Sequence, residues 1–198
     1  MKLILASNSA SRRAMLEAAG VPFSTAKPHV DEYAATQSLV AAETKPRDVA
    51  DALAQMKALK VSAREPHALV LGSDTVVELD DGTMLEKPAS RNEAASHLLR
   101  MSGRRHKLHS AAVMAEGGRT VWREVDTATL FVRPLGHCFI DDYLDAEWPA
   151  IAGCVGCFRI EARGAQLFAR IDGSQFTVLG LPLLPVLDYL RVRGVLAS

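Results

Sequence analysis

The chain carries a short hydroxyl-rich and basic loop near its amino end, at residues 7–13 (SNSASRR). The loop follows an apolar run and precedes a helix-like segment, so it falls at a corner between a predicted strand and a predicted helix. The first turn of a helix offers free N–H groups and the positive end of a dipole. Hydroxyls and guanidiniums beside such groups are typical of phosphate binding. A serine-capped helix with two solvated arginines would explain the same residues, and no P-loop or Rossmann pattern is present.

Carboxylates that could hold Mg²⁺ or activate water occur at two places. Asp74 lies in Gly-Ser-Asp-Thr just after the apolar run 68–71, and the ends of strands are where α/β proteins place catalytic groups. Asp31 and Glu32 form an acidic pair in a predicted loop. Ordinary alternatives exist for each, because a turn aspartate often bonds its own backbone and an acidic pair is often only solvated. Taken singly, Lys57 and Lys87 resemble surface lysines.

Two further patterns concern metal ions. Cys154 and Cys157 form a single C-x-x-C, and a zinc site would need two more ligands, for which His137 and Cys138 are candidates. A single C-x-x-C is a poor match to a zinc motif. A second pair, His106 and His109, lies three residues apart in a predicted strand. Because this spacing puts them on opposite faces, we do not expect them to share a metal.

The elements that must position these residues alternate along the chain. Apolar runs predict strands at 2–6, 21–26, 68–77, 106–115, 120–132 and 165–171. Apolar spacing and capping residues predict helices at 10–19, 47–63, 90–102, 136–145 and 181–193, with residues 27–46 as a polar loop. Hairpin turns require antiparallel pairs. The fold class is therefore α/β with a mixed sheet flanked by helices.

The length and composition of the chain exclude several classes of protein. The chain has 198 residues, of which 48% are apolar, and 23 basic residues balance 23 acidic ones. This length suits one domain or two lobes with one core, stable without disulfides or a structural metal. Neutral charge argues against a nucleic-acid binder, and no apolar run is long enough for a membrane span. Without a secretory signal, we expect a cytoplasmic protein with reduced cysteines.

Taken together, the motifs are more specific than each alone. The segments 5–13, 30–32, 56–58, 72–77, 86–88, 102–106 and 180–183 occur in the order typical of the Maf family, which the chain resembles from about residue 3 to 190. The resemblance implies a nucleoside triphosphate pyrophosphatase that cleaves between the α- and β-phosphates with Mg²⁺ or Mn²⁺. It also implies one domain over 1–198: an elongated, two-lobed α/β fold around one nucleotide cleft, shared with inosine triphosphate pyrophosphatases and often homodimeric.

The resemblance also implies roles for individual residues. Asp74 corresponds to the general base and, with Glu32, to the metal ligands. The phosphate contacts correspond to Ser7, Ser9, Arg12, Lys57 and Lys87. These types fit the chemistry, because triphosphate hydrolysis depends on positioning and charge neutralisation.

Base specificity in the family is expected at Ser11, Thr75 and Glu161. The segment 156–161 is nearer to the branch acting on 7-methylguanosine triphosphate than to the thymidine/uridine branch. That branch, however, has tryptophan where this chain has Ser11 and glutamine where it has Thr75. A carboxylate at 161 only accepts hydrogen bonds, which suits the N–H donors of guanine, so we predict a guanine-type base.

Two alternatives stay open at this stage. Glu161 could simply pair with Arg159 or Arg163, and a methylated base would need another stacking ring, such as Phe158 or Trp148. A nucleotide-binding regulator without significant catalysis is the alternative function, because Maf proteins are also linked to arrest of septum formation and cell division.

Overall fold

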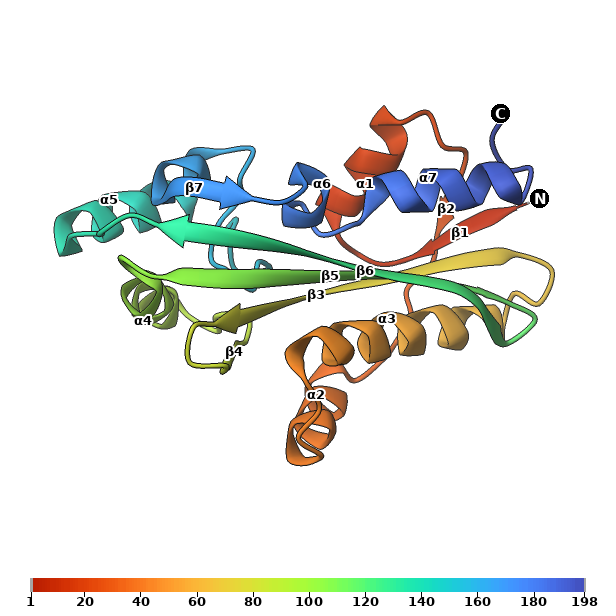
Figure 1. The fold of residues 1–198 in the computed structure, drawn as a ribbon, viewed down its shortest axis with the longest axis horizontal. Coiled ribbons are helices and arrows are strands. Elements are labelled where there is room, and N and C mark those ends of the chain that lie inside the picture. The colour runs from red at the N-terminus through yellow and green to blue at the C-terminus, as the bar shows by residue number, and fades with distance from the viewer. Residues whose placement is uncertain (1, 198) are drawn as a thin grey trace. The chain divides into compact units, whose positions relative to one another are not determined.

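The computed structural model describes residues 2–197, in which strands and helices alternate (Figure 1). The strands are β1 (Leu3–Ala6), β2 (Ser24–Thr25), β3 (Leu69–Leu79), β4 (Met84–Leu85), β5 (Arg105–Glu116), β6 (Arg119–Val132) and β7 (Phe168–Asp172). The helices are α1 (Ala10–Ala18), α2 (Glu32–Ala41), α3 (Pro46–Ser62), α4 (Arg91–Met101), α5 (His137–Glu147), the 3₁₀ helix η1 (Arg163–Leu167), α6 (Gln175–Val178) and α7 (Leu183–Val192). No helix among residues 2–197 has both the length and the apolar character needed to cross a membrane.

All seven strands form one mixed sheet. Its order is β2-β1-β3-β5-β6-β7, and β4 pairs with β3. Strand β1 runs parallel to both β2 and β3, whereas the β3–β4 and β6–β7 pairs are antiparallel. This confirms the predicted α/β class with a mixed sheet flanked by helices.

The chain divides into two compact units. The first comprises the amino-terminal segment up to Thr75, the segment His109–Asp126 and the segment from Gln175 onward. The second comprises Val76–Leu108 and Thr127–Ser174. Strands β3, β5 and β6 each contribute residues to both units.

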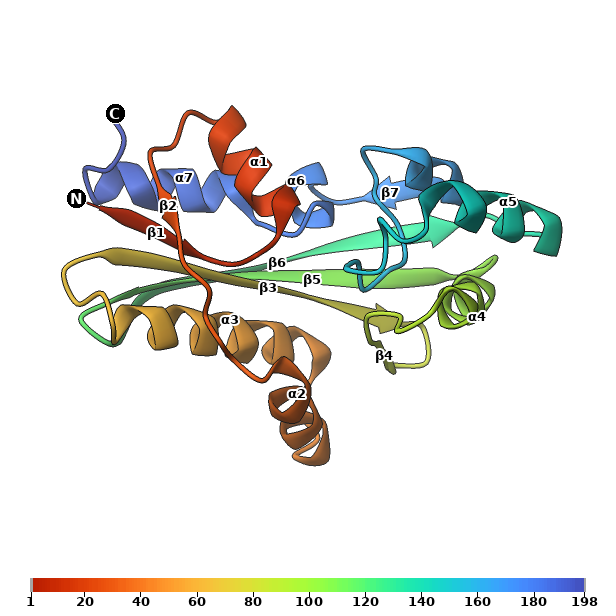
Figure 2. The ribbon, with the colours of Figure 1, turned by 180° about the vertical axis from the view of Figure 1, so that it is seen from behind.

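In the first unit, helices cover both faces of the strands (Figures 1 and 2). Helices α1 and α7 bury Leu16 and Leu190 against Leu5 of β1 and Leu71 of β3. On the opposite face, Val61 of α3 packs with Ile4, Ala6 and Val70. Successive strand residues therefore serve two separate cores, as the period of two in a strand requires.

The second unit holds β4, α4, α5, η1 and β7, and contacts join α4 to α5. Its clearest local feature is the capping box predicted from Ser90 and Glu93. The Ser90 hydroxyl accepts a hydrogen bond from Glu93 N, and the Glu93 carboxylate accepts one from Ala89 N. The same kind of cap begins α1, where the Ser9 hydroxyl accepts from Arg12 N.

Three segments differ from the sequence prediction. The polar loop predicted at 27–46 contains helix α2, which begins after the N-cap Asp31 and has no buried residue, so it shows no apolar periodicity. The strand predicted at 165–171 starts within the 3₁₀ helix η1, and β7 begins only at Phe168. The short helix α6 was not predicted, whereas the helix predicted at 181–193 is present as α7. Gly180, with φ +100°, and Pro182 separate the two helices.

Gly72 marks a close approach between α3 and β3. A Cβ atom at this position would lie 2.2 Å from Ala54 O and 2.6 Å from Ala58 N, both in the backbone of α3. Such distances are far inside van der Waals contact, so any side chain at 72 would push the helix away from the strand. The glycine and the two alanines thus set the distance between the helix and the sheet.

We predict that Gly72→Ala lowers the free energy of unfolding by about 2 kcal/mol or more, because a rigid backbone cannot move aside as a flexible side chain can. The matched control is Gly153→Ala, since a Cβ at 153 would meet no atom within 4 Å. Denaturant unfolding of both variants is the measurement. Equal stability of the two would contradict the close approach.

Candidate active site

The candidate site lies where β1 ends and β3 continues. The two strands pair through Ala6 and Gly72, after which β1 gives way to the loop before α1. The next residues of β3 are Ser73, Asp74 and Thr75. Because side chains alternate along a strand, Asp74 shares the face of Gly72, toward α3, whereas Ser73 and Thr75 project to the face that α1 covers.

On the α3 face, Lys57 joins two carboxylates. Its ammonium lies 2.5 Å from Asp74 Oδ1 and 2.8 Å from Glu32 Oε1, and only 5% of its side chain is exposed. The lysine is one residue from Ala58, which touches Gly72, and Asp74 is two residues beyond Gly72 on the strand. The close approach of helix and strand therefore brings this ion pair together.

On the other face, Arg12 is fixed by three hydrogen bonds. Its Nε donates to Gly180 O at 2.8 Å, Nη1 donates to Ser7 Oγ at 3.2 Å, and Nη2 donates to Thr75 Oγ1 at 2.9 Å. Burial lowers the pKa of the guanidinium, while the Asp74 and Glu32 carboxylates act to raise it. The guanidinium remains charged at neutral pH, since arginine does not deprotonate in proteins.

The three loop serines have different roles. Ser7 Oγ accepts from both Ser9 N and Arg12 Nη1, so its own O–H is left to donate elsewhere. Ser9 caps α1, and Ser11 donates to Leu179 O at 2.6 Å. The residues predicted to bind phosphate in this part of the chain (Ser7, Ser9, Arg12 and Lys57) thus lie around the same strand ends as Asp74 and Glu32.

Three members of this cluster, Ser73, Ser110 and Thr177, were not singled out from the sequence. Ser73 Oγ donates to Gly180 O, Thr75 Oγ1 contacts Ser110 Oγ at 3.0 Å, and Ser110 Oγ donates to Thr177 O. Period-two alternation along 72–75 is the signal that separates Ser73 and Thr75 from Asp74. Nothing local in the sequence marks Ser110 or Thr177, because their partners are far away along the chain.

The carboxylates of Glu32 and Asp74 are the donors that the site offers to a divalent cation. Both are hard oxygen ligands held beside one ammonium, which suits Mg²⁺ or Mn²⁺ completed by water and phosphate oxygens. Among residues 2–197, no group of three His, Cys, Asp or Glu residues could hold a metal, and this includes the C-x-x-C. Cys157 is buried 3.6 Å from His97 Nδ1, and burial raises its pKa to about 12.

Comparisons with known proteins show which family the chain belongs to. A family model described as Maf-like protein matches residues 2–193. A protein of Sphingopyxis alaskensis is 51% identical over 195 residues, covering 98% of each chain, and one of Caulobacter vibrioides is 47% identical over 192 residues, covering 97% of this chain and 96% of its own. Both relatives are named nucleoside triphosphate pyrophosphatase. The chain belongs to the Maf family.

Among solved structures, this Maf chain is similar to a HAM1 protein from Coxiella burnetii, with a TM-score of 0.46 and 13% identity over 67% of this chain and 73% of the other. The Ham1 protein of Staphylococcus aureus gives a TM-score of 0.42, also with 13% identity, over 67% of this chain and 71% of the other.

The remaining predicted residues of the Maf chain belong to the second unit. Lys87 and Glu161 are both exposed. Each acts electrostatically on the half-buried thiol of Cys154, whose pKa is raised by burial, further raised by Glu161 and lowered by Arg159 and Lys87. The structure therefore brings Lys87 and Glu161 to one neighbourhood, beside the C-x-x-C.

The structure bears on two alternatives raised by the sequence, the pairing of Glu161 with an arginine and the ring that could stack on a base. The carboxylate that hydrogen-bonds Arg159 is Glu147, at 2.8 Å from Nη2 and 3.1 Å from Nε. Glu161 acts on the same guanidinium only electrostatically, and its pairing with Arg163 stays an alternative. Phe158 is buried against Phe168 at a centroid distance of 4.8 Å, so it is a poor stacking surface for a base. Trp148, which is half-buried, remains as the stacking candidate.

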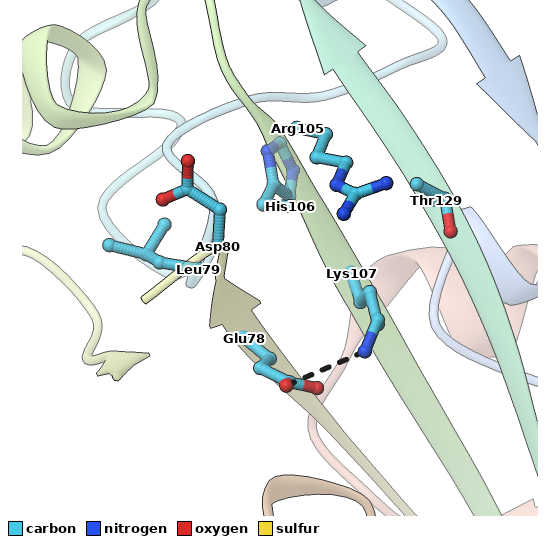
Figure 3. A pocket seen from close by; sticks show the side chains of 7 residues that line it. All are labelled: Glu78, Leu79, Asp80, Arg105, His106, Lys107 and Thr129. Carbon is cyan, nitrogen blue, oxygen red and sulfur yellow. Dashed lines mark ion pairs between the residues drawn. The ribbon is translucent and has the colours of Figure 1, made fainter. Parts of the chain in front are cut away.

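A separate cavity of about 170 Å³ lies in the second unit (Figure 3). Its lining includes none of the predicted site residues and consists of Glu78, Leu79, Asp80, Arg105, His106, Lys107 and Thr129. Figure 3 shows the Glu78 carboxylate paired with Lys107, at 3.5 Å. Both ring nitrogens of His106 are buried without a hydrogen-bond partner among the described residues, and the ring contacts Phe158 and Phe168.

The buried His106 predicts a pH dependence of stability. Burial lowers its pKa to about 4, whereas an unfolded histidine has a pKa of about 6.5. Between these values the unfolded chain binds a proton that the folded chain does not, so stability falls as the pH drops from 6.5 to 4. The loss should reach roughly 3 kcal/mol and then level off.

Unfolding of wild type and His106→Leu at pH 4.5 and pH 7.5 is the measurement. The variant should lose less stability on acidification than wild type, and the exposed His67→Gln should behave as wild type does. An equal acid loss in wild type and His106→Leu would show that this imidazole is not kept neutral by the fold.

Proposed function

We propose that this Maf chain hydrolyses nucleoside triphosphates between the α- and β-phosphates, giving a nucleoside monophosphate and pyrophosphate. The observation that carries the proposal is the joint cluster at the end of β1 and the middle of β3. There, one buried ammonium, one buried guanidinium and two carboxylates surround the start of a helix. The names of the curated relatives support the same activity.

The hydrogen-bond donors that the cluster leaves unused suit phosphate as a ligand. Three of the five N–H groups of Arg12 bond to the protein, so two remain. Lys57 uses two of its three N–H groups on carboxylates and keeps one. The free O–H of Ser7 and the first N–H groups of α1 add further donors. A triphosphate, with several negative charges, would satisfy all of them.

Glu32 and Asp74 would hold the divalent cation. When bound, such an ion neutralises phosphate charge and lowers the pKa of a bound water. Asp74 uses Oδ1 for Lys57, which leaves Oδ2 to orient a water molecule and take its proton. Lys57 keeps the two carboxylates close together, since like charges alone would repel.

A guanine-type base is the substrate preference that we propose. Guanine presents N1–H and N2–H₂ donors side by side, and a carboxylate offers only acceptors. Glu161 is exposed, and its neighbour Arg159 is already paired with Glu147. These two facts leave the Glu161 carboxylate suited to contact a ligand. Lys87, which acts on the same thiol as Glu161, would contact a phosphate of the same nucleotide.

Asp74→Asn tests the catalytic proposal. The variant keeps the shape of the side chain, so it should fold and still bind nucleotide, but its kcat should fall about 10²–10⁴-fold without the base. Pyrophosphate release from a panel of nucleotides, with and without Mg²⁺, is the measurement, and Asp80→Asn, an exposed site in the other unit, is the matched control. Turnover near wild type in Asp74→Asn would remove Asp74 from this role. Binding without turnover of every nucleotide by wild type would instead favour a regulator.

Glu161→Gln tests the base preference. An amide offers one acceptor and two donors, which suits uracil and thymine better than guanine. We therefore expect the ratio of kcat/KM for GTP or 7-methyl-GTP over UTP or dTTP to fall by about tenfold, the range of one altered base contact. Glu65→Gln in the first unit is the matched control. If wild type prefers UTP or dTTP, or if the ranking is unchanged in Glu161→Gln, Glu161 does not contact the base.

A further inference from the structure

A series of hydrogen-bonded hydroxyl groups extends from Arg12 through the first unit. Arg12 Nη2 donates to Thr75 Oγ1, Thr75 Oγ1 contacts Ser110 Oγ at 3.0 Å, and Ser110 Oγ donates to Thr177 O at 2.8 Å. The Thr177 hydroxyl in turn donates to the Asp126 carboxylate. These groups come from α1, β3, β5, α6 and β6 and include none of the carboxylates near Lys57.

The direction of each hydrogen bond in this series is fixed by the last acceptor, the carbonyl of Thr177. A hydroxyl has one proton, and that of Ser110 is used on the carbonyl of Thr177. Thr75 must therefore donate its own proton to Ser110, or to Gly180 O at 3.4 Å. In both cases Thr75 has only lone pairs left for Arg12, which supplies the N–H. The hydroxyl of Thr75 has no proton to offer to a nucleobase.

Gly180 fixes the same guanidinium from the other side. Its carbonyl accepts from Arg12 Nε at 2.8 Å and from Ser73 Oγ at 3.1 Å. With φ +100°, this position favours glycine, and a Cβ there would lie 3.2 Å from Thr75 Oγ1. The segment before α7 is also held by Ser11, which donates to Leu179 O. The carboxy-terminal segment thus orients a side chain from the amino-terminal loop.

From these contacts we infer that Thr75 is a positioning residue: its hydroxyl, together with the Gly180 carbonyl, holds Arg12 so that its two remaining N–H groups face phosphate. The positioning role differs from the base specificity that the family resemblance implies for Thr75, since in this arrangement the hydroxyl does not donate to a base. The inference rests on the proposed function only in taking phosphate as the ligand of Arg12. It requires that Thr75 affects all nucleotides alike, because phosphates carry no base identity.

Binding of inorganic pyrophosphate with Mg²⁺, and of α,β-methylene analogues of GTP and UTP, tests the inference by calorimetry. Thr75→Val removes the hydroxyl at nearly constant shape and should weaken all three ligands by the same factor, about tenfold, as expected for a lost bond to a charged group. Thr75→Ser keeps the hydroxyl and should restore binding to within about twofold of wild type. Thr120→Val, where the lost hydroxyl bonds Gln55, is the matched control and should bind as wild type does.

A double variant separates positioning from direct contact. In an Arg12→Met background, adding Thr75→Val should cause no further loss, since the partner of the hydroxyl is already gone. If Arg12→Met does not fold, the equal effect of Thr75→Val on GTP and UTP analogues decides the question in the wild-type background.

Four results would overturn the inference: wild-type binding in Thr75→Val, a loss that differs between GTP and UTP analogues, an undiminished loss in the Arg12→Met background, or a wild type that does not bind pyrophosphate. The proposed hydrolysis is judged separately. If wild type binds pyrophosphate with this dependence on Thr75 but cleaves no nucleotide, the positioning role stands and the pyrophosphatase proposal fails.

Discussion

The contact between α3 and β3 at Gly72 is the constraint on which the candidate site depends. Because no side chain separates helix from strand there, the backbone of α3 at Ala54 and Ala58 touches β3 directly. Lys57, between these two alanines, can then reach Asp74 with its ammonium almost fully buried. Glu32 reaches the same ammonium from the first turn of α2, the helix before α3. A bulkier residue at 72 would increase the distance between α3 and β3, and the ion pairs of Lys57 with Glu32 and Asp74 depend on that distance.

The alternation of β3 divides the charges of the site between two faces of one strand. Asp74 faces Lys57, whereas Thr75 faces Arg12 and the Gly180 carbonyl. Buried charges are costly unless they are paired or hydrogen-bonded: Asp74 is paired with Lys57, and Arg12 donates to three neutral oxygens. The same arrangement leaves donors unused on Arg12, Lys57 and Ser7, which suits a polyanionic ligand. A chain with no net charge can therefore still present a locally cationic site beside two carboxylates.

Local features of the fold could be predicted from the sequence, and non-local ones could not. The caps at Ser9 and Ser90 and the helix at 47–63 depend on neighbours within a few residues, and all three are present. Helix α2 escaped prediction because it buries nothing and so has no apolar period. The family resemblance named Arg12 and Thr75, but the bond from Arg12 to Gly180 joins residues 168 positions apart, and no pattern in the sequence encodes it. The hydrogen-bond order at the Thr75 hydroxyl follows from such distant contacts.

We propose that the cluster of Arg12, Glu32, Lys57 and Asp74 binds a metal–nucleotide complex. The most direct test is a crystal structure with an α,β-methylene nucleoside triphosphate and Mn²⁺, in which anomalous scattering locates the ion. We expect one Mn²⁺ peak bonded to carboxylate oxygens of Glu32 and Asp74, with phosphate oxygens accepting from Arg12 and Lys57. Nucleotide or Mn²⁺ bound elsewhere, with the ion pairs of Lys57 undisturbed and no phosphate beside Arg12, would contradict it.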